Sequence, residues 1–155
     1  MKPKNDKGQP IGDSHRFLKE EWNELLALGK IRNIWELADD VADGEGFDKR
    51  HIEPNGKYTM EVTLPKNTIL IRYGYESGSY TAPDGTQYDE LSLPYVQDTM
   101  EFHKYRVIAD GITVTCLVNR GKVAPSFGLK GGGVQYKHHM NILRCLQAKE
   151  IERLI

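Results

Sequence analysis

From residue 57 to its end, the chain consists of short runs rich in β-branched and aromatic residues, each bounded by residues that favour turns. A helix is expected from about residue 139 to 148, before the last run. Strands are expected at 58–64, 68–73, 79–83, 100–108, 112–118, 134–137 and 150–155. Because these runs follow one another without alternating long helices, they predict a largely antiparallel sheet and exclude a doubly wound dinucleotide fold.

The chain begins differently. Residues 1–13 lack hydrophobic periodicity and contain Lys, Asp, Gly and Pro, which is typical of a flexible lead-in or linker. Apolar residues at helical spacing then predict one helix from Asp13 or Ser14 to Gly29 and a second from about residue 31 to 41. We therefore expect one α+β domain over residues 14–155, with a helical part at 14–43 and a β-rich catalytic part at 57–155.

The charge of the chain points to no polyanionic partner. With 21 basic and 22 acidic residues, it offers no extended basic surface for nucleic acid or an anionic membrane. Its apolar runs are too short for a membrane span or a signal peptide. Two cysteines, Cys116 and Cys145, lack the spacing of a disulfide framework or a metal site, and we expect both to pack as small apolar residues.

Three consecutive glycines, Gly131, Gly132 and Gly133, stand directly before a glutamine and a tyrosine. They match neither the dinucleotide fingerprint nor a P-loop. Because glycine loses the most conformational freedom on folding, such a run predicts positive φ angles, or the close approach of a ligand or another backbone. Gln135 would then present an uncharged amide beside the loop. The alternative is a flexible turn.

Arg72 and Tyr80 lie at equal distances from Glu76, with Gly74 and Gly78 placed symmetrically between them. This symmetry predicts a hairpin in which Arg72 and Tyr80 are directly opposite, with Cβ atoms about 5 Å apart on one face. A guanidinium beside a phenol ring is suited to clamp a phosphate next to a base, ribose or pyridinium. The alternative is a solvated cross-strand pair.

Five histidines raise the question of a metal site or a nuclease. His138 and His139 are adjacent, so in a strand they point to opposite faces, and no carboxylate or cysteine accompanies them at a ligand spacing. No metal site is therefore expected. A pair of His103 and His138 acting as acid and base, as in a ribonuclease, remains an alternative.

Three segments in order resemble the TNT family, named for the tuberculosis necrotizing toxin. They read RYGYESGSYTAPDGTQYDELSLP from residue 72, FHKYRVI from residue 102 and APSFGLKGGGVQY from residue 124. The resemblance spans roughly residues 58–155 and leaves the expected N-terminal helices unmatched. Two departures stand out: Phe102 replaces the first tyrosine of a Tyr-His-x-Tyr-like strand, and Ser92 stands where many members have an arginine before Leu-Pro. Lys104 or Arg106 would have to replace that lost phosphate contact.

The resemblance implies a compact, strongly bent sheet and an NAD+ glycohydrolase, with NAD+ and possibly NADP+ as substrate and no metal or further cofactor. It also implies the toxin domain of a secreted bacterial polymorphic toxin that acts in the cytoplasm of a target cell and is blocked by an immunity protein. The catalytic residues it implies are Arg72, Tyr80 and Gln135. The residues it implies for NAD+ binding are Arg72, Tyr80, His103, Phe127, Gly131, Gly132 and Gly133.

In this scheme Arg72 binds the pyrophosphate, Tyr80 packs against the nicotinamide riboside, Gln135 positions the ribose or the attacking water, and the glycine amides donate to the ligand. The missing pair of carboxylates is tolerable, because nicotinamide leaves NAD+ as a neutral molecule and needs no general acid. An ADP-ribosyltransferase is the nearest alternative, although such enzymes usually carry a glutamate near the ribose. An RNA-binding or ribonuclease module using the HKYR strand is another.

Overall fold

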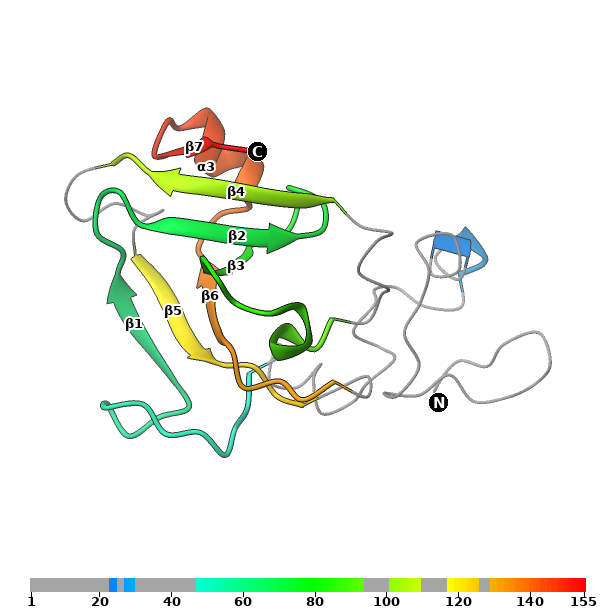
Figure 1. Cartoon of the computed structure of the whole chain (residues 1–155), viewed down its shortest axis with the longest axis vertical. Coiled ribbons are helices and arrows are strands. Elements are labelled where there is room, and N and C mark those ends of the chain that lie inside the picture. The colour runs from blue at the N-terminus through cyan, green and yellow to red at the C-terminus, as the bar shows by residue number, and fades with distance from the viewer. Residues whose placement is uncertain (1–22, 25–26, 30–46, 94–100, 110–116, 126–128) are drawn as a thin grey trace.

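The computed structural model describes residues 23–24, 27–29, 47–93, 101–109, 117–125 and 129–155. Within them, seven strands form one sheet in the order β1-β5-β6-β3-β2-β4-β7, and every neighbouring pair is antiparallel (Figure 1). The strands are β1 (Thr59–Thr63), β2 (Ile69–Tyr73), β3 (Tyr80–Pro83), β4 (Phe102–Val107), β5 (Leu117–Lys122), β6 (Val134–His138) and β7 (Ile151–Arg153). The short helices are the 3-10 helix η2 (Tyr88–Leu91) and α3 (Ile142–Gln147).

The sheet bends at β3, which divides its pairing between two neighbours. Tyr80 and Thr81 pair with β6, whereas Ala82 and Pro83 pair with β2. Figure 1 shows the result: β2 and β4 run across the direction of β5 and β6. The expected bent, largely antiparallel sheet is confirmed, and it has one concave side filled by the core and another side that carries the clefts described below.

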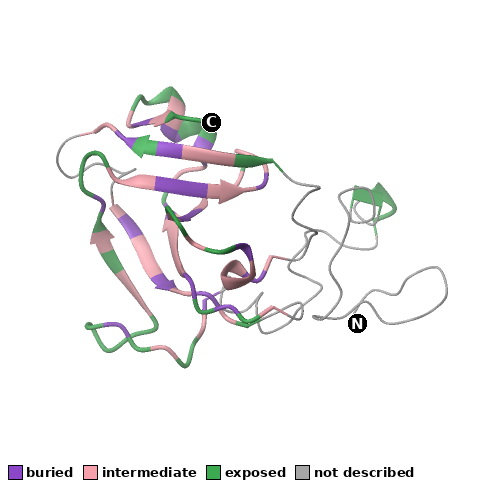
Figure 2. Cartoon of the chain, in the orientation of Figure 1, coloured by how far each residue is buried: buried purple, intermediate pink, exposed green. Residues whose placement is uncertain are grey.

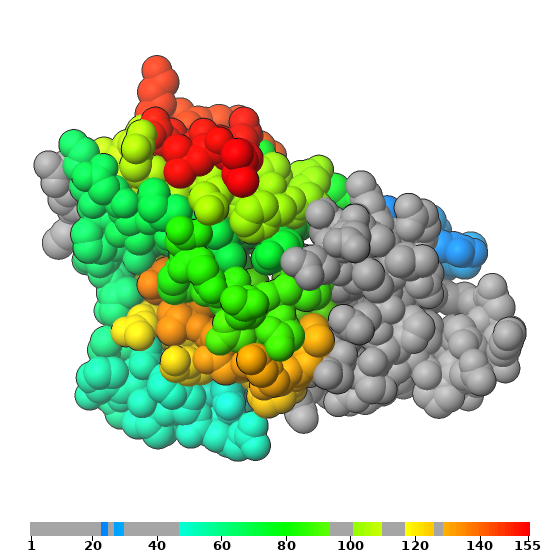
Figure 3. Space-filling model, in the orientation of Figure 1, coloured from blue at the N-terminus to red at the C-terminus, as the bar shows by residue number. Residues whose placement is uncertain are grey.

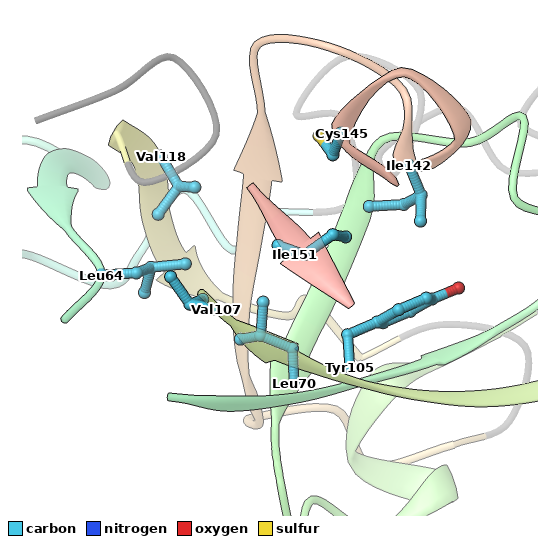
Figure 4. Close-up of a cluster of buried hydrophobic side chains, with 8 residues drawn as sticks. All are labelled: Leu64, Leu70, Tyr105, Val107, Val118, Ile142, Cys145 and Ile151. Carbon is cyan, nitrogen blue, oxygen red and sulfur yellow. The ribbon is translucent and has the colours of Figure 1, made fainter. Parts of the chain in front are cut away.

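The core fills one side of the bend. Alternation along the strands places Leu70, Tyr105, Val107 and Val118 on this side, where each is fully buried. α3 and β7 cover them (Figure 4). The buried cluster consists of Leu64, Leu70, Tyr105, Val107, Val118, Ile142, Cys145 and Ile151. Figure 2 shows the buried stretches in the middle of β2 and β4, and Cys145 packs as a small apolar residue, as expected.

α3 is fixed at its N-terminus by its own cap and by the β2–β3 hairpin. The side chain of Asn141 accepts a hydrogen bond from the Arg144 amide at 2.9 Å. The first amides of a helix have no partner within it. Here those of Ile142 and Leu143 donate to the carbonyl oxygens of Gly78 and Glu76, at 2.9 and 3.0 Å. The helix therefore holds the loop of the hairpin in place.

Most of the expected strands and the C-terminal helix are found within a few residues of their predicted bounds. The main difference is β5, which was expected to end at residue 118 but continues through a polar stretch to Lys122. The expected lead-in, Cys116 and nearly all of the two N-terminal helices lie outside the described residues; residues 23, 24 and 27 are helical. No helix in the described part of the chain is long and apolar enough to cross a membrane.

Candidate active site

A small cleft of about 40 Å³ lies where β2, β3 and β6 meet. Arg72, Tyr80 and Gln135, which come from three separate strands, all belong to its lining. The full lining consists of Ile71, Arg72, Tyr73, Tyr80, Thr81, Ala82, Leu91, Leu93 and Gln135. The bend of the sheet at β3 thus brings together residues that are far apart in the sequence.

Tyr80 and Gln135 share one face of the sheet. Tyr80 is opposite Lys137 and Gln135 is opposite Gly121, and Gln135 and Lys137 are two residues apart on β6. Phe47 packs on the same face, because a Cβ atom at Gly121 would lie 2.5 Å from its ring. The ring centroids of Phe47 and Tyr80 are 6.4 Å apart. Phe47 was not singled out in the sequence, where it is a lone aromatic residue in a polar, glycine-containing stretch.

The predicted register of the hairpin is wrong by one residue. Leu70 pairs with Pro83 and Ile71 with Ala82, so the same register sets Arg72 opposite Thr81 and not opposite Tyr80. The connecting loop is asymmetric, because Gly74 has a φ of 120° and a tight turn follows, in which the Gly78 amide donates to the Tyr75 carbonyl oxygen at 3.1 Å. Arg72 consequently extends on the same side of β2 as Leu70, toward the loop.

The guanidinium of Arg72 binds the main chain of this loop. Its Nε donates to the carbonyl oxygen of Tyr75 at 2.8 Å, and its Nη1 donates to that of Tyr80 at 2.9 Å. It also lies against Gly78, where an added Cβ atom would be 1.9 Å from Nη2. Gly78 is therefore a glycine because the guanidinium occupies the space that a side chain would need.

Glu76, at the tip of the loop, joins the hairpin to β4 and β7. It accepts a hydrogen bond from the Tyr105 hydroxyl at 2.7 Å, and others from Arg153 Nη2 at 2.6 Å and Nε at 3.1 Å. Burial alone would raise the pKa of Glu76, but the hydrogen bonds from Arg153 and Tyr105 lower it below its ordinary value. Burial, followed by the bond to Glu76, raises the pKa of Tyr105. The loop is thus anchored by a charged carboxylate.

The glycine run has its amides directed at protein carbonyls. Gly131, Gly132 and Gly133 donate to the carbonyl oxygens of Asp89, Val123 and Glu90, at 3.1, 2.8 and 3.1 Å. The expectation that these amides donate to a ligand is therefore wrong. The φ angles of Gly131 and Gly132 are 65° and 86°, and a Cβ atom at Gly131 would lie 2.8 Å from main-chain atoms of residues 123–125. The close approach is that of another backbone.

The histidines do not form the alternative acid and base pair. His103 lies on β4 and His138 on β6, and β2 and β3 separate them in the sheet. His103 Nε2 is 2.9 Å from Glu101 Oε1, and the buried His138 has its Nε2 2.7 Å from Thr81 Oγ1. His103 is not among the described residues that line either cleft. Among the residues that the structure describes, no group of three or more His, Cys, Asp or Glu residues could hold a metal ion.

Phe127 lies outside the described residues. The two basic residues expected to replace a missing arginine both bind acidic side chains. Lys104 Nζ is 3.2 Å from Asp84 Oδ1, and Arg106 pairs with Glu152. At the position of that arginine, Ser92 is buried with a φ of 46°. Both basic residues are therefore engaged with carboxylates in this structure.

A second and larger cleft, of about 590 Å³, adjoins the first and shares Ile71 and Tyr73 with it. Figure 3 shows the surface hollowed where the yellow-green residues of β4 face the green residues that follow β3. This cleft was not expected from the sequence. Its described lining consists of Ile71, Tyr73, Asp84, Gly85, Thr86, Gln87, Tyr88, Asp89, Phe102 and Leu129.

Solved structures resemble this fold at low sequence identity. A chain in the atomic structure of tuberculosis necrotizing toxin complexed with its immunity factor IFT has a TM-score of 0.52 and 15% identity, covering 97% of this chain and 75% of that one. A chain in the structure of Tse6 in complex with Tsi6 has a TM-score of 0.48 and 17% identity, covering 85% of this chain and 90% of that one. At these identities the first likeness shows the fold alone.

Sequence comparison adds a closer relative. The conidial surface nicotinamide adenine dinucleotide glycohydrolase nadA of Aspergillus fumigatus is 34% identical over an alignment of 97 residues that covers 60% of this chain. The match spans 41% of the length of that relative. The sequence profile of the family described as tuberculosis necrotizing toxin matches residues 63–154. Because this match takes in more than half of the chain, the chain belongs to the tuberculosis necrotizing toxin family.

Proposed function

We propose that this chain is an NAD+ glycohydrolase, which hydrolyses the bond between nicotinamide and ribose to release nicotinamide and ADP-ribose. The observation that carries the proposal is the meeting of Arg72, Tyr80 and Gln135 at one cleft. Family membership and the likeness to a curated NAD glycohydrolase support it. The single catalytic domain spans residues 14–155 and follows a linker of residues 1–13.

Hydrolysis of NAD+ does not require a general acid. The nicotinamide of NAD+ is a cation that departs as a neutral molecule, so the leaving group needs no proton. The demanding tasks are to hold the ribose as it gains oxocarbenium character, to exclude bulk water and to orient one water for attack. In our proposal the Gln135 amide orients that water or the ribose hydroxyls, and the Tyr80 ring, supported by Phe47, packs against the nicotinamide riboside.

Arg72 acts through the main chain in this proposal. Its two hydrogen bonds to main-chain oxygens fix the hairpin that carries Tyr80. Its side chain extends on the same side of β2 as Leu70, opposite to the face of Tyr80 and Gln135, so its effect on the cleft is to position Tyr80. The glycine loop acts indirectly, because its amides bind two carbonyl oxygens within η2 and that of Val123 directly after β5, and thereby fix the start of β6. His103 is opposite Arg72 in the register of β2 and β4.

We further propose that the chain is the effector domain of a secreted bacterial toxin that depletes NAD+, and possibly NADP+, in the cytoplasm of a target cell. It would then need a dedicated immunity protein in the cell that makes it. The similar structures of the necrotizing toxin and of Tse6 were solved with the proteins named in their descriptions, the immunity factor IFT and Tsi6. No metal and no cofactor beyond the substrate take part in the proposed reaction.

The test is to incubate the purified protein with NAD+ and measure nicotinamide and ADP-ribose by chromatography. We expect stoichiometric release of both, and a decrease of about 100-fold in kcat for Gln135→Ala, the scale typical of losing one transition-state hydrogen-bond donor. Gln147→Ala, an exposed position on α3, is the matched control and should retain the parent rate. Loss of NAD+ at the parent rate in a folded Gln135→Ala protein would contradict the role of Gln135.

The same incubation separates hydrolysis from ADP-ribosyl transfer. Free ADP-ribose in the absence of any acceptor supports the hydrolase. With NAD+ labelled in the adenosine part, label that appears on protein or nucleic acid only when these are added would instead support a transferase. A ribonuclease reading has lost its main support, because β2 and β3 separate the two histidines that it requires.

A further inference from the structure

The larger cleft has a wall of three aromatic rings. Tyr73 on β2 is paired in register with Phe102 on β4, and their ring centroids are 4.9 Å apart. Tyr88 of η2 meets Tyr73 edge to face at 5.0 Å. Tyr88 is 8% exposed, whereas Phe102 is 38% exposed. The row of rings therefore runs from the buried ring of Tyr88 to the ring of Phe102, which is exposed at the cleft.

We propose that this cleft binds the adenine ring of the dinucleotide, stacked against Phe102. The proposal rests on the proposed NAD+ glycohydrolase activity and adds to it a site for the half of the substrate that does not react. A volume of about 590 Å³ suits a nucleoside, since small-molecule sites usually measure about 300–1,000 Å³. Stacking on an aromatic side chain is a common way to hold a base.

The charges of the lining favour a base over a phosphate. Its charged members among the described residues are Asp84 and Asp89, and none of these lining residues is a lysine or arginine. Carboxylates repel a pyrophosphate but accept hydrogen bonds from an exocyclic amine such as that of adenine. Both carboxylates are about half exposed and are held by lysines, with Lys104 Nζ 3.2 Å from Asp84 and Lys130 Nζ 3.6 Å from Asp89.

The same charges disfavour the nicotinamide end. Nicotinamide is cationic in the substrate and neutral once it has left, so carboxylates around its ring would stabilise the reactant more than the transition state. The small cleft with Gln135 has no acidic residue in its described lining, and it shares Ile71 and Tyr73 with the larger cleft. The two joined clefts thus differ in charge, and the acidic one is the better match for the adenine half.

Adenosine monophosphate alone, as the adenine half, tests the site by a readout that does not depend on catalysis. Its dissociation constant is measured by titration calorimetry or NMR for the parent, Phe102→Ala, Phe102→Tyr and Ile52→Ala proteins. Ile52 is an apolar residue that is 63% exposed in the loop before β1 and serves as the matched control. We expect Phe102→Ala to weaken binding by about tenfold, within the range found for base stacking, while the other two variants bind like the parent.

Kinetics provide the second readout. Phe102→Ala should raise KM for NAD+ by about tenfold and leave kcat within twofold, because it removes binding of a part of the substrate that does not react. Adenosine monophosphate affinity that is equal in parent and Phe102→Ala, no binding by the parent at millimolar concentration, or a fall in kcat at unchanged KM would each overturn the proposed site.

The two proposals fail separately. If the parent hydrolyses NAD+ and Phe102→Ala changes neither KM nor nucleotide binding, the proposed activity is supported and the proposed adenine site is refuted. If the parent binds adenosine monophosphate through Phe102 but releases no nicotinamide from NAD+, the adenine site is supported and the proposed activity is refuted. Circular dichroism and urea unfolding establish that each variant is folded, which we expect for a substitution at a partly exposed position of β4.

Discussion

Arg72 donates from its side-chain Nη1 to the main-chain carbonyl oxygen of Tyr80, 2.9 Å away, so the Arg72 side chain binds the main chain of Tyr80. The bond spans the hairpin loop, and the guanidinium fills the space above Gly78. A substitution of Arg72 therefore removes a structural contact together with a charge. Separating these effects requires variants that disturb the loop while keeping the arginine.

Gly78→Ala is such a variant. The new Cβ atom would lie 1.9 Å from Arg72 Nη2, so the guanidinium must move and its bonds to the loop are weakened. We expect a loss of about 1–3 kcal/mol in the free energy of unfolding and a clear decrease in NAD+ hydrolysis, measured by urea unfolding and nicotinamide release. Ser77→Ala, exposed in the same loop, should change neither quantity. Parent-like activity in Gly78→Ala would show that the position of Arg72 is unimportant for the reaction.

Glu76→Gln tests the anchor of the loop. The neutral amide cannot replace the charge that holds Arg153 and accepts from Tyr105, so we expect a loss of about 2–3 kcal/mol in the free energy of unfolding at pH 7. Glu61→Gln, a pair-forming glutamate with a side chain that is 53% exposed, should cost much less. Urea unfolding of the three proteins measures the difference.

The pKa of Glu76 gives this difference a dependence on pH. Because the folded state lowers the pKa below the ordinary 4.5, the carboxylate stabilises the fold fully above about that pH, and its contribution is lost as the pH falls through the lower, folded value. The parent and Glu76→Gln should thus converge in stability in acid and diverge toward neutral pH. A constant difference from pH 2 to 7 would contradict the charged anchor.

Gly131→Ala and Gly132→Ala should differ in severity. Both have positive φ, which costs a non-glycine residue about 1–2 kcal/mol. At Gly131 the new Cβ atom would also meet main-chain atoms at 2.8 Å, whereas nothing lies within 4 Å of it at Gly132. We expect Gly131→Ala to be the less stable by at least about 1 kcal/mol in thermal or urea unfolding. Equal stabilities would mean that φ alone explains the glycines.

Phe47→Ala tests the support behind Tyr80. Phe47 is 3% exposed, and its removal opens a cavity above Gly121 that we expect to cost about 3–5 kcal/mol in the free energy of unfolding. Phe47→Leu should recover much of that stability but not the ring contact with Tyr80 at 6.4 Å. A folded Phe47→Leu protein with lower kcat would then indicate that the ring positions Tyr80. Unchanged kinetics would limit Phe47 to packing.

The strands were predictable because β-branched and aromatic residues mark them locally. β5 shows where such marks fail: its second half reads Asn119 to Lys122, and these polar residues are in a strand because β1 and β6 pair with them on both sides. The prediction of the hairpin register failed for a related reason. The residues are spaced symmetrically in the sequence, but the positive φ of Gly74 makes the loop asymmetric. Pairing partners are a tertiary property.

The candidate site was predictable in part. Arg72, Tyr80 and Gln135 were singled out from the hairpin spacing and the glycine run, and the family resemblance added roles for them that stay predictions. The glycine run predicted positive φ angles or a close neighbour, with a flexible turn as the alternative, and the sequence left open whether that neighbour was a ligand or another backbone. The larger cleft escaped notice because its aromatic wall joins Tyr73, Tyr88 and Phe102 from separate segments, each an ordinary hydrophobic residue on its own.

The division of β3 between two partners has a consequence for how activity is lost. Tyr80 and Thr81 belong to one half of the sheet, and Ala82 and Pro83 to the other. If either half frays, β3 loses a flank, and the three walls of the small cleft no longer face one another. Local opening of either half of the sheet should therefore abolish activity. Most backbone amides of the other half should still be protected from exchange with solvent deuterium at that point.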